Sequence, residues 1–488
     1  MYSELHREGR QGDAMDAKVW PRRTSSGCLA LALMLASATI AAEAPPHDVI
    51  GVTSAQLDAD YWSRRDRASG KPVLRRDEIA SLNARLERSD PSVNDLAALP
   101  ATLDAARVRG WIEPISKRPD GALYDERGEQ LCEAALRALE QSLALDSIPP
   151  DRATRYGLVV RRAPLRAFPT SRRVFNAPGS TNIDRFQENA LFPGTPVAVA
   201  HESADGDVHA LDPCFVQRRD DERPLSVGER DAVLGYARKQ PYLVVTGPTV
   251  RTVYTPEAPA LSELQLDMGV RVPTRPDWPG DQPVNGQHPY TNHVVELPVR
   301  DADGALAFAP ALLPRSADVA ADYLPLTRAN VLRQGFKFLG ERYGWGHDYN
   351  ARDCSGFVSE VYRSFGVTLP RNTRDQAISP AYDRIAFDDS WSRKERIEAL
   401  RKLDVGDLVY IPGHVMMVIG QECDGPYVIH DTTGIGYLDA RGAYKRVALN
   451  GVSVTPLLPL YAAEDMQTID RITAIQRIRL VDRADAAR

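Results

Sequence analysis

At 488 residues, the chain is too long for a single hydrophobic core, and its length predicts three or four domains. The 60 basic and 66 acidic residues give a net charge of −6 without any basic block that would neutralise a phosphate backbone, so we expect no nucleic-acid partner. A hydrophobic content of 43% with 36 prolines is typical of a folded protein with many strands and turns.

The N-terminus has the pattern of a signal peptide. A basic stretch, Lys18–Arg23, precedes an apolar run over 28–42 that is too short to span a bilayer comfortably. We therefore expect residues 1–44 to be a signal peptide and the mature protein to be exported, to the periplasm or cell envelope, with no stable membrane span. Translation from Met15 would give a signal of ordinary length. Cys28 stands at the start of the apolar run, whereas a lipid-attached cysteine would follow it, so lipid attachment is disfavoured. An uncleaved anchor is the alternative to a signal peptide.

The cysteine content argues against a disulfide scaffold. Removal of the signal leaves Cys132, Cys214, Cys354 and Cys423, of which the first two are able to pair in an oxidising compartment. No Cys-x-x-Cys motif is present, so the sequence gives no support for a structural zinc site, and it indicates no cofactor.

The first part of the mature chain has the spacing of helices. Apolar residues recur three and four apart over 78–86 and again over 131–139, and two prolines at 149 and 150 mark a boundary. We expect a small helical module over residues 45–150.

Short apolar runs bounded by turn residues follow, and these predict strands. Runs at 157–160 and 195–200 indicate one β module over 151–240. Runs at 242–246 and 294–300, the latter before the turn at 301–304, indicate a second over 241–325. The composition changes after Pro325, and residues 326–488 carry the chemistry.

Cys354 is the predicted nucleophile. Cys354, Val358, Val361 and Phe365 fall on one helical stripe, with Asp353 as the expected N-cap. A cysteine in the first turn of a helix is exposed to unpaired backbone N–H groups and to the helix dipole, which favour a thiolate. The alternative is a small buried cysteine that packs the start of the helix.

Two histidines accompany this cysteine on predicted strands. His414 lies in a strand over 413–420 and His430 in a strand over 427–430. If the two strands form a hairpin with a loop of about five residues, Met416 lies opposite His430, and the two histidines share one face. One histidine is then placed to accept the cysteine proton while the other orients it.

Five sequence blocks resemble one known family. In order, they are 338–346 (FLGERYGWG), 352–356 (RDCSG), 369–376 (LPRNTRDQ), 406–409 (GDLV) and 413–414 (GH). In order and spacing they are similar to the NlpC/P60 catalytic domain. The preceding layout resembles the subgroup with a helical stabilising segment and two bacterial SH3-like domains, and 156–170 is similar to the opening of the first.

The resemblance implies a papain-like α+β catalytic domain. It implies hydrolysis of the amide between the γ-carboxyl of D-glutamate and a diamino acid in peptidoglycan stem peptides or muropeptides, by a protein that we expect to be a monomer. Cys354, His414 and His430 take the roles of nucleophile, base and orienter.

The resemblance also implies substrate contacts. Tyr343 matches a tyrosine that faces the reacting carbonyl, with a packed aromatic as the alternative. Asp353 and Ser355 match positions that help hold the substrate's amino terminus, with plain helix capping as the alternative. Arg371 is expected either to meet a substrate carboxylate or to form a salt bridge.

Two departures from the family pattern limit this transfer. His347 stands where a second glycine is usual, and we expect it to narrow or re-aim the wall of the cleft. The stretch 205–210 stands where relatives usually carry a tryptophan after an acidic turn, which puts contacts from the first SH3-like module in doubt.

Three competing functions remain open from the sequence. The first is a catalytically inactive cell-wall-binding protein, and the second is a metal site at the cysteine and the two histidines, which lacks an obvious fourth ligand. The third is an amidase or acyltransferase that uses the same triad on another substrate.

Overall fold

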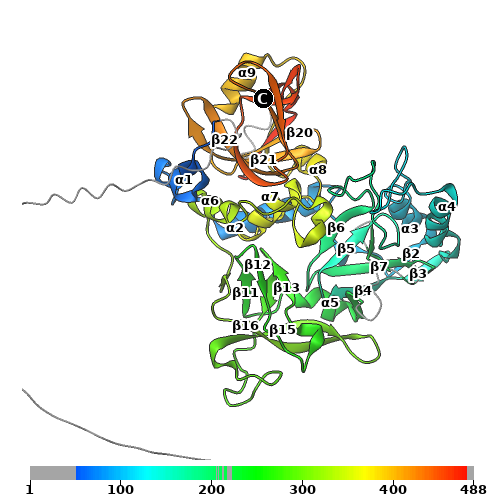
Figure 1. Cartoon of the computed structure of the whole chain (residues 1–488). Helices are drawn as coiled ribbons and strands as arrows, with labels where there is room; N and C mark the ends of the chain where they lie inside the picture. Colours follow the sequence, from blue (N-terminus) through cyan, green and yellow to red (C-terminus); the bar gives the residue numbers. More distant parts are fainter. Residues whose placement is uncertain (1–50, 205, 207, 211–213, 217–222, 481–488) are drawn as a thin grey trace, which may run out of the picture. The chain divides into compact units, whose positions relative to one another are not determined.

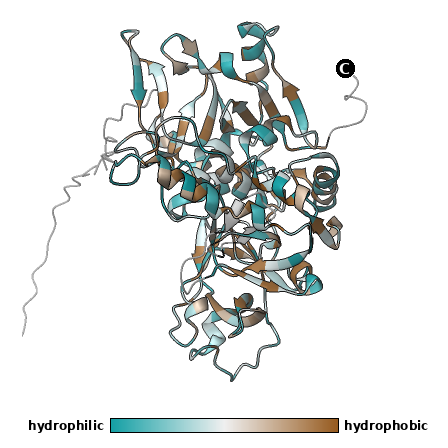
Figure 2. Ribbon diagram, turned by 90° about the vertical axis from the view of Figure 1, so that its right-hand side faces the viewer, coloured by the Kyte–Doolittle hydropathy of each residue, from teal (hydrophilic) through white to brown (hydrophobic). Residues whose placement is uncertain are grey.

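The computed structural model describes residues 51–480, except 205, 207, 211–213 and 217–222 (Figure 1). The predicted signal peptide lies outside these residues. Short helices alternate with antiparallel sheets in the described chain, which confirms the α+β class. No helix within this part of the chain combines the length and the apolarity needed to cross a membrane. Figure 2 shows hydrophobic residues recurring along the helices and strands.

The helices before residue 150 contribute to two cores. The predicted helix over 78–86 is part of α2, which buries Leu82 and Leu86, and these pack with Trp62 of α1 into the core that also contains Cys354. The helices α3 and α4 pack instead with the first β module. The region predicted as one helical module therefore completes two hydrophobic cores. Its elements are η1 (Ser54–Leu57), α1 (Ala59–Arg65), β1 (Pro72–Leu74), α2 (Arg76–Ser89), η2 (Leu96–Ala98), β2 (Thr102–Asp104), α3 (Ala105–Ile112), α4 (Glu133–Ser142), η3 (Leu145–Ser147) and β3 (Asp151–Ala153).

The first β module is a seven-stranded antiparallel sheet in the order β10-β4-β7-β8-β9-β5-β6. The strands predicted at 157–160 and 195–200 correspond to β4 and β7, which pair with each other. The residues at 205 and 207 and the side chains of 208–210 lie outside the described residues. The elements are β4 (Arg155–Val159), β5 (Ala163–Arg166), β6 (Gln187–Leu191), β7 (Pro196–Glu202), β8 (Val208–Ala210), β9 (Cys214–Val216), β10 (Leu225–Gly228) and α5 (Arg230–Tyr236).

The second β module consists of small antiparallel sheets around a separate hydrophobic core. The predicted strands at 242–246 and 294–300 correspond to β11 and β15, and the predicted turn at 301–304 joins β15 to β16. The elements are β11 (Tyr242–Val245), β12 (Thr249–Arg251), η4 (Pro259–Leu261), β13 (Gln265–Asp267), β14 (Arg271–Pro273), η5 (Pro289–Thr291), β15 (Asn292–Arg300), β16 (Leu306–Pro314) and β17 (Val319–Ala320).

The remaining chain is built on a six-stranded antiparallel sheet in the order β19-β28-β20-β21-β22-β25. Four of its other strands form a smaller sheet in the order β24-β23-β26-β27. The elements are β18 (Leu326–Thr327), α6 (Arg328–Phe336), η6 (Trp345–Asn350), α7 (Cys354–Arg363), α8 (Thr373–Ile378), β19 (Asp383–Ala386), α9 (Arg393–Leu400), β20 (Leu408–Ile411), β21 (His414–Glu422), β22 (Gly425–Thr432), β23 (Ile435–Leu438), β24 (Tyr444–Val447), β25 (Gly451–Pro456), β26 (Leu460–Ala463), β27 (Met466–Gln467), η7 (Thr468–Arg471) and β28 (Ala474–Arg477).

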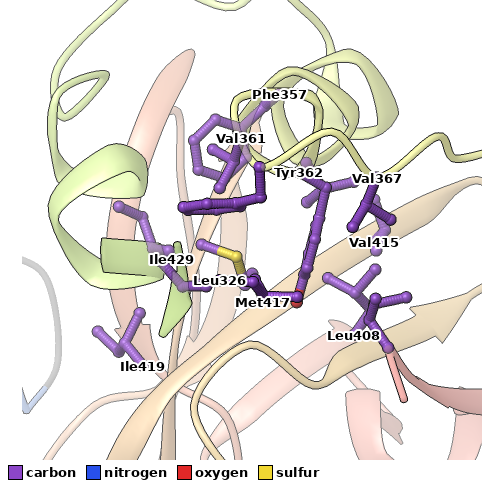
Figure 3. Close-up of a cluster of buried hydrophobic side chains, with 14 of the residues drawn as sticks. Leu326, Phe357, Val361, Tyr362, Val367, Leu408, Val415, Met417, Ile419 and Ile429 are labelled. Atoms are coloured by element: carbon purple, nitrogen blue, oxygen red, sulfur yellow. The ribbon is translucent and has the colours of Figure 1, made fainter. Parts of the chain in front are cut away.

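Helix α7 packs across this sheet and forms the centre of the core. The predicted stripe of Cys354, Val358, Val361 and Phe365 is buried, as its spacing indicates. Side chains of α7 contact alternate residues of β21, among them Met417 (Figure 3). Because successive strand residues point to opposite faces, the residues between them face away from α7 into a second core.

The hairpin that carries the histidines differs from prediction at its tip. The predicted five-residue loop is wrong. Strand β21 extends to Glu422 and β22 begins at Gly425, so that only a two-residue turn separates them. A bulge between Val418 and Gly420 then shifts the register by one residue, so that Val418 pairs with Val428. Beyond the bulge the pairing is the predicted one, and it places His414 and His430 near each other as expected.

Candidate active site

Cys354 is the first residue of α7, and its thiol lies against the start of β21. The side chain is 5% exposed, and Sγ lies 4.0 Å from the carbonyl oxygen of Gly413. The backbone N–H of Val415 also donates to the sulfur. The thiol thus contacts the backbone on both sides of His414.

Asp353 holds the start of this helix, as the sequence predicts for an N-cap. Its Oδ1 accepts from the N–H of Gly356 at 2.8 Å and from the hydroxyl of Ser355 at 3.1 Å, and its Oδ2 accepts from the N–H of Gly346 at 3.0 Å. These bonds connect the preceding loop to the first turn of the helix, which fixes where Cys354 is presented.

The two predicted histidines are in direct contact. His414 Nε2 lies 2.8 Å from His430 Nδ1, and His430 Nε2 lies 3.1 Å from the Oγ1 of Thr455 on β25. His430 is therefore held on both ring nitrogens, and its ring orients that of His414. Thr455 was not singled out from the sequence, because nothing in a lone strand threonine indicates such a contact.

Burial keeps these groups neutral. Burial, and then the negative charge of Asp353, raises the pKa of the Cys354 thiol to about 12. Burial also lowers the pKa of His414 to about 4 and that of His430 well below its usual range. The thiolate expected from the position at the helix start is therefore opposed by desolvation, which is the larger effect here. In this structure the resting pair is a thiol and a neutral imidazole.

Tyr343 lies close to the cysteine. It is buried, and burial, followed by the electrostatic interactions of its hydroxyl with Cys354 and Asp353, raises the pKa of this hydroxyl far above the usual range. The hydroxyl therefore stays protonated and is available as a hydrogen-bond donor. A cavity of about 260 Å³ is lined by Tyr343, His414 and His430, and this cavity lies on the histidine side of the site.

Arg371 is engaged by protein groups. Its guanidinium donates to Asp353 Oδ2 at 2.8 Å, to the Ser355 hydroxyl at 2.8 Å and to the Oδ1 of Asn189 on β6. This arrangement favours the salt-bridge role that the sequence left open over a free carboxylate-binding role. It also brings a residue of the first β module to the active-site helix, which no sequence signal revealed.

His347 joins the same network through Glu360 of α7 and Arg371. The residue has a φ of +63°, a conformation that glycine adopts more readily, and its side chain is buried. Its Nε2 lies 3.0 Å from Glu360 Oε1, and its Nδ1 lies 3.0 Å from Arg371 Nη2. The substitution expected to affect the cleft wall therefore also supplies a contact between α7 and Arg371.

A buried carboxyl next to His430 escaped the sequence analysis. Asp431 is 0% exposed, and neither of its carboxyl oxygens has a hydrogen-bond partner within the described residues. Burial, and then the charges of Asp353 and Glu341, raises its pKa to about 9. Asp431 is therefore a neutral acid near the cysteine at pH 7. Asp431 directly follows His430 on a strand, so the two side chains point to opposite faces. The pattern that places His414 and His430 on one face therefore does not include Asp431.

The three cysteines whose side chains are described form no disulfide bond, and the described residues contain no cluster of metal-binding side chains. Cys132, Cys354 and Cys423 are unpaired thiols, while the side chain of Cys214 lies outside the described residues. Within residues 51–480, the gaps excepted, no three or more histidine, cysteine, aspartate or glutamate side chains are grouped to hold a metal ion.

Comparisons with known proteins agree with this architecture. The model of the NlpC/P60 family matches residues 340–453, and that of the SH3 domain of SH3b1 type matches residues 173–209. No curated protein sequence gives a significant match.

Two solved structures are similar to this chain. An NlpC/P60 endopeptidase from Photobacterium damselae subsp. piscicida aligns with a TM-score of 0.65 at 16% identity, over 84% of this chain and 94% of that one. An NlpC/P60 family protein from Bacillus cereus aligns with a TM-score of 0.41 at 19% identity, over 67% of this chain and all of that one. The first likeness extends the common fold over most of the chain. The chain therefore contains an NlpC/P60 domain at residues 340–453 and an SH3b domain at residues 173–209.

Proposed function

We propose that the protein is a cell-wall cysteine endopeptidase that hydrolyses the amide between the γ-carboxyl of D-glutamate and a diamino acid in peptidoglycan stem peptides. One observation carries the proposal. Within an NlpC/P60 domain, the thiol of Cys354 lies against the strand end that begins with His414, and His414 contacts His430 at 2.8 Å. In this proposal Cys354 is the nucleophile, His414 is the base and His430 is the orienting group.

The chemistry follows from the neutral resting pair. As the sulfur of Cys354 attacks the γ-carbonyl carbon, its proton passes to His414, and the carbonyl oxygen becomes an oxyanion, to which in this proposal the Tyr343 hydroxyl donates a hydrogen bond. When the C–N bond breaks, His414 returns that proton to the leaving amine. A water molecule, deprotonated by His414, then attacks the thioester and releases Cys354 as a thiol.

Export is part of the proposal. A substrate in the cell wall requires the protein outside the cytoplasm, and the basic and apolar pattern of residues 1–44 supplies the signal. In the same layout, residues 45–150 form the helical segment, 151–240 and 241–325 two SH3-like domains that bind peptidoglycan, and 326–488 the catalytic domain. The acyl-side groups Asp353 and Ser355 would hold the substrate's amino terminus.

The deciding experiment uses defined stem peptides. The mature protein and its Cys354→Ala variant are incubated with a γ-D-glutamyl-diamino acid tripeptide and with the same peptide joined through the α-carboxyl, and the products are identified by mass. Cleavage of the γ-linked peptide alone, lost in Cys354→Ala, is expected. Cleavage of another bond would favour an amidase, and transfer to an added amine would favour an acyltransferase. An absence of turnover with retained binding to peptidoglycan would favour an inactive binding protein.

A further inference from the structure

Arg352, two positions before Cys354, is a buried cation to which the mechanism above gives no role. Its side chain is 0% exposed, and its guanidinium lies 4.7 Å from the centroid of the Phe338 ring. A buried charge is tolerated only where other groups satisfy its donors. The groups that bind this guanidinium therefore fix the segment that leads into the nucleophile.

Five hydrogen bonds match the five N–H donors of the guanidinium. Nε donates to Glu360 of α7 at 2.8 Å, and Nη1 donates to the two carboxylate oxygens of Glu341 at 2.6 and 2.7 Å. Nη2 donates to the carbonyl oxygen of Pro248 at 2.7 Å and to Oδ1 of Asp267 at 2.9 Å. Pro248 precedes β12 and Asp267 ends β13, so two of the five bonds lead to the second β module.

The backbone of Arg352 joins the nucleophile to Tyr343. Asp353 and Cys354 follow it in the chain, and Arg352 itself forms a parallel bridge with Tyr343. Its carbonyl oxygen accepts from the N–H of Gly344 at 2.6 Å. A shift of Arg352 would therefore be transmitted to both groups that meet the substrate carbonyl in the proposed reaction.

Asp267 is itself held in place on both carboxylate oxygens. It is fully buried, its Oδ1 also accepts from Nε2 of Gln265 at 2.9 Å, and its Oδ2 lies 3.5 Å from Nε of Arg162. The strand that carries it packs into the separate core of the second β module through Leu266. Asp267 thus gives Arg352 an anchor that belongs to a different part of the chain from the nucleophile helix.

We propose that Asp267 is a positioning residue, which fixes through Arg352 how Cys354 meets the reacting carbonyl. The same anchor sets the position of the Tyr343 hydroxyl, and this part rests on the proposed function. A displacement of about 1 Å in a catalytic group, even when its origin is far from the chemistry, costs up to about 10²-fold in rate. The second β module therefore contributes to turnover through a residue that does not touch the substrate.

The test is a double-mutant cycle on kcat with the γ-linked tripeptide. Asp267→Ala removes the anchor and is measured alone and together with Tyr343→Phe. Asp267→Asn retains an acceptor oxygen and serves as the conservative variant. Asp318→Ala is the matched control. Asp318 also joins the second β module to the end of α6, through an ion pair of 2.6 Å with Lys337, but it gives none of the five bonds to Arg352.

Asp267→Ala should lower kcat about 10-fold and change KM less than about 2-fold, because it disturbs the alignment and not the binding groups. Asp267→Asn should recover part of this loss. In the Tyr343→Phe background, Asp267→Ala should cost less than about 3-fold, since one of the two groups that it aligns has been removed. Asp318→Ala should match its parent in both backgrounds.

An equal loss in both backgrounds would show that Asp267 only stabilises the fold, because a smaller folded fraction lowers every rate by the same factor. The absence of a loss in either background would also overturn the proposal. If circular dichroism shows that Asp267→Ala does not fold, Asp267→Asn is carried through the same cycle. A smaller loss that again depends on Tyr343 is then expected, and an equal loss in both backgrounds again overturns the proposal.

Alkylation separates this proposal from the proposed function. If wild type cleaves no stem peptide, the proposed function fails, and the rate at which iodoacetamide modifies Cys354 in the folded protein decides the positioning role. Asp267→Ala should then react at least about 3-fold faster than wild type, because a loosened helix start opens more often, while Asp318→Ala should not. Equal rates for the three proteins would overturn the positioning role as well.

Discussion

The contact between His414 and His430 gives the two residues different roles. In the proposed mechanism, His414 takes the proton of Cys354 and returns it to the leaving amine, whereas His430 contacts His414 through its Nδ1 and is itself held by Thr455. Replacement of the base removes the group that transfers the proton. Replacement of the orienting residue leaves that group in place and only makes its orientation less well defined.

We therefore expect His414→Ala to lower kcat/KM by roughly 10²-fold or more. His430→Asn and His430→Gln retain a hydrogen-bonding side chain and should keep more activity than His430→Ala. Thr455→Val should have a smaller effect in the same direction. Rates on the γ-linked tripeptide, with circular dichroism to verify folding, measure this. A His414→Ala protein with near-wild-type rates would remove this residue from the mechanism.

Asp431 gives a pH dependence that can be isolated. Its pKa is raised to about 9, so the folded protein holds a proton that the unfolded chain releases near pH 4. The free energy of unfolding therefore falls as pH rises through this interval and stops falling above pH 9. Above pH 7 the buried histidines are neutral in both states, and Glu188 and Asp407, whose pKa values are raised to about 7, complete most of their ionisation by about pH 8.

Between pH 7 and 9, wild type should lose up to about 1.4 kcal/mol of unfolding free energy per pH unit from this group. Asp431→Asn should make the profile flatter, while the exposed Asp465→Asn should leave it unchanged. Urea unfolding at pH 7, 8 and 9 measures the effect. A flat wild-type profile would contradict a neutral, buried Asp431.

At the scale of elements, the start of α7 packs tightly against the preceding loop where Gly356 meets the ring of His347. A Cβ at Gly356 would lie 2.6 Å from the ring Cε1 of His347 and 2.8 Å from its Nε2. Because the ring of His347 contacts both Glu360 and Arg371, it cannot move away from an added Cβ without breaking these contacts. The close approach of the helix and the loop therefore requires glycine at position 356, because the ring of His347 occupies the space that a Cβ would need.

Gly356→Ala should destabilise the protein by about 1–3 kcal/mol through overpacking. In a His347→Gly background, the same substitution should cost much less, because the clashing ring is absent. Thermal unfolding of wild type, both single variants and the double variant gives the coupling energy. Equal costs in the two backgrounds would refute the contact. Gly110→Ala, where a Cβ meets nothing within 4 Å, is the control and should not destabilise.

For the whole molecule, residues far away in sequence complete the catalytic core. Trp62 of α1 packs against Tyr427 of β22 with ring centroids 5.3 Å apart, and its Nε1 donates to the carbonyl oxygen of Gln56 at 2.8 Å. A Cβ at Gly420 would lie 2.5 Å from the Trp62 ring, which shows how closely the helix covers the hairpin. The hairpin that carries the histidines is therefore stabilised by the N-terminal segment.

Trp62→Ala should lower the free energy of unfolding by about 3–5 kcal/mol. On heating, Cys354 should become open to alkylation at a lower temperature than in wild type, because the lost packing belongs to the same core as α7. The partly exposed Leu57→Ala is the control and should unfold near wild type. Mass spectrometry of alkylated Cys354 across a temperature series measures this. An unchanged profile for Trp62→Ala would show that the segment does not stabilise the catalytic core.

Local patterns in the sequence account for much of this protein. Spacing of apolar residues predicted α2 and α7, alternation and turn residues predicted β4, β7, β11 and β15, and the blocks around Cys354 and His414 indicated the NlpC/P60 domain. These features depend on neighbours in the chain, so they are readable from it. The register of the two histidines was also predicted, although the bulge that restores it was not.

Only the tertiary structure decided which distant groups meet. Burial raises the pKa of Cys354 and lowers that of His414, and neither depends on the residues beside them alone. The partners of Arg371 and the isolation of Asp431 arise from segments that are far apart in the chain, as Arg371 and Asn189 are, 182 positions apart. Electrostatics and packing act through space, so a sequence supplies the groups that carry the chemistry, and the fold decides their charge, their partners and their reach.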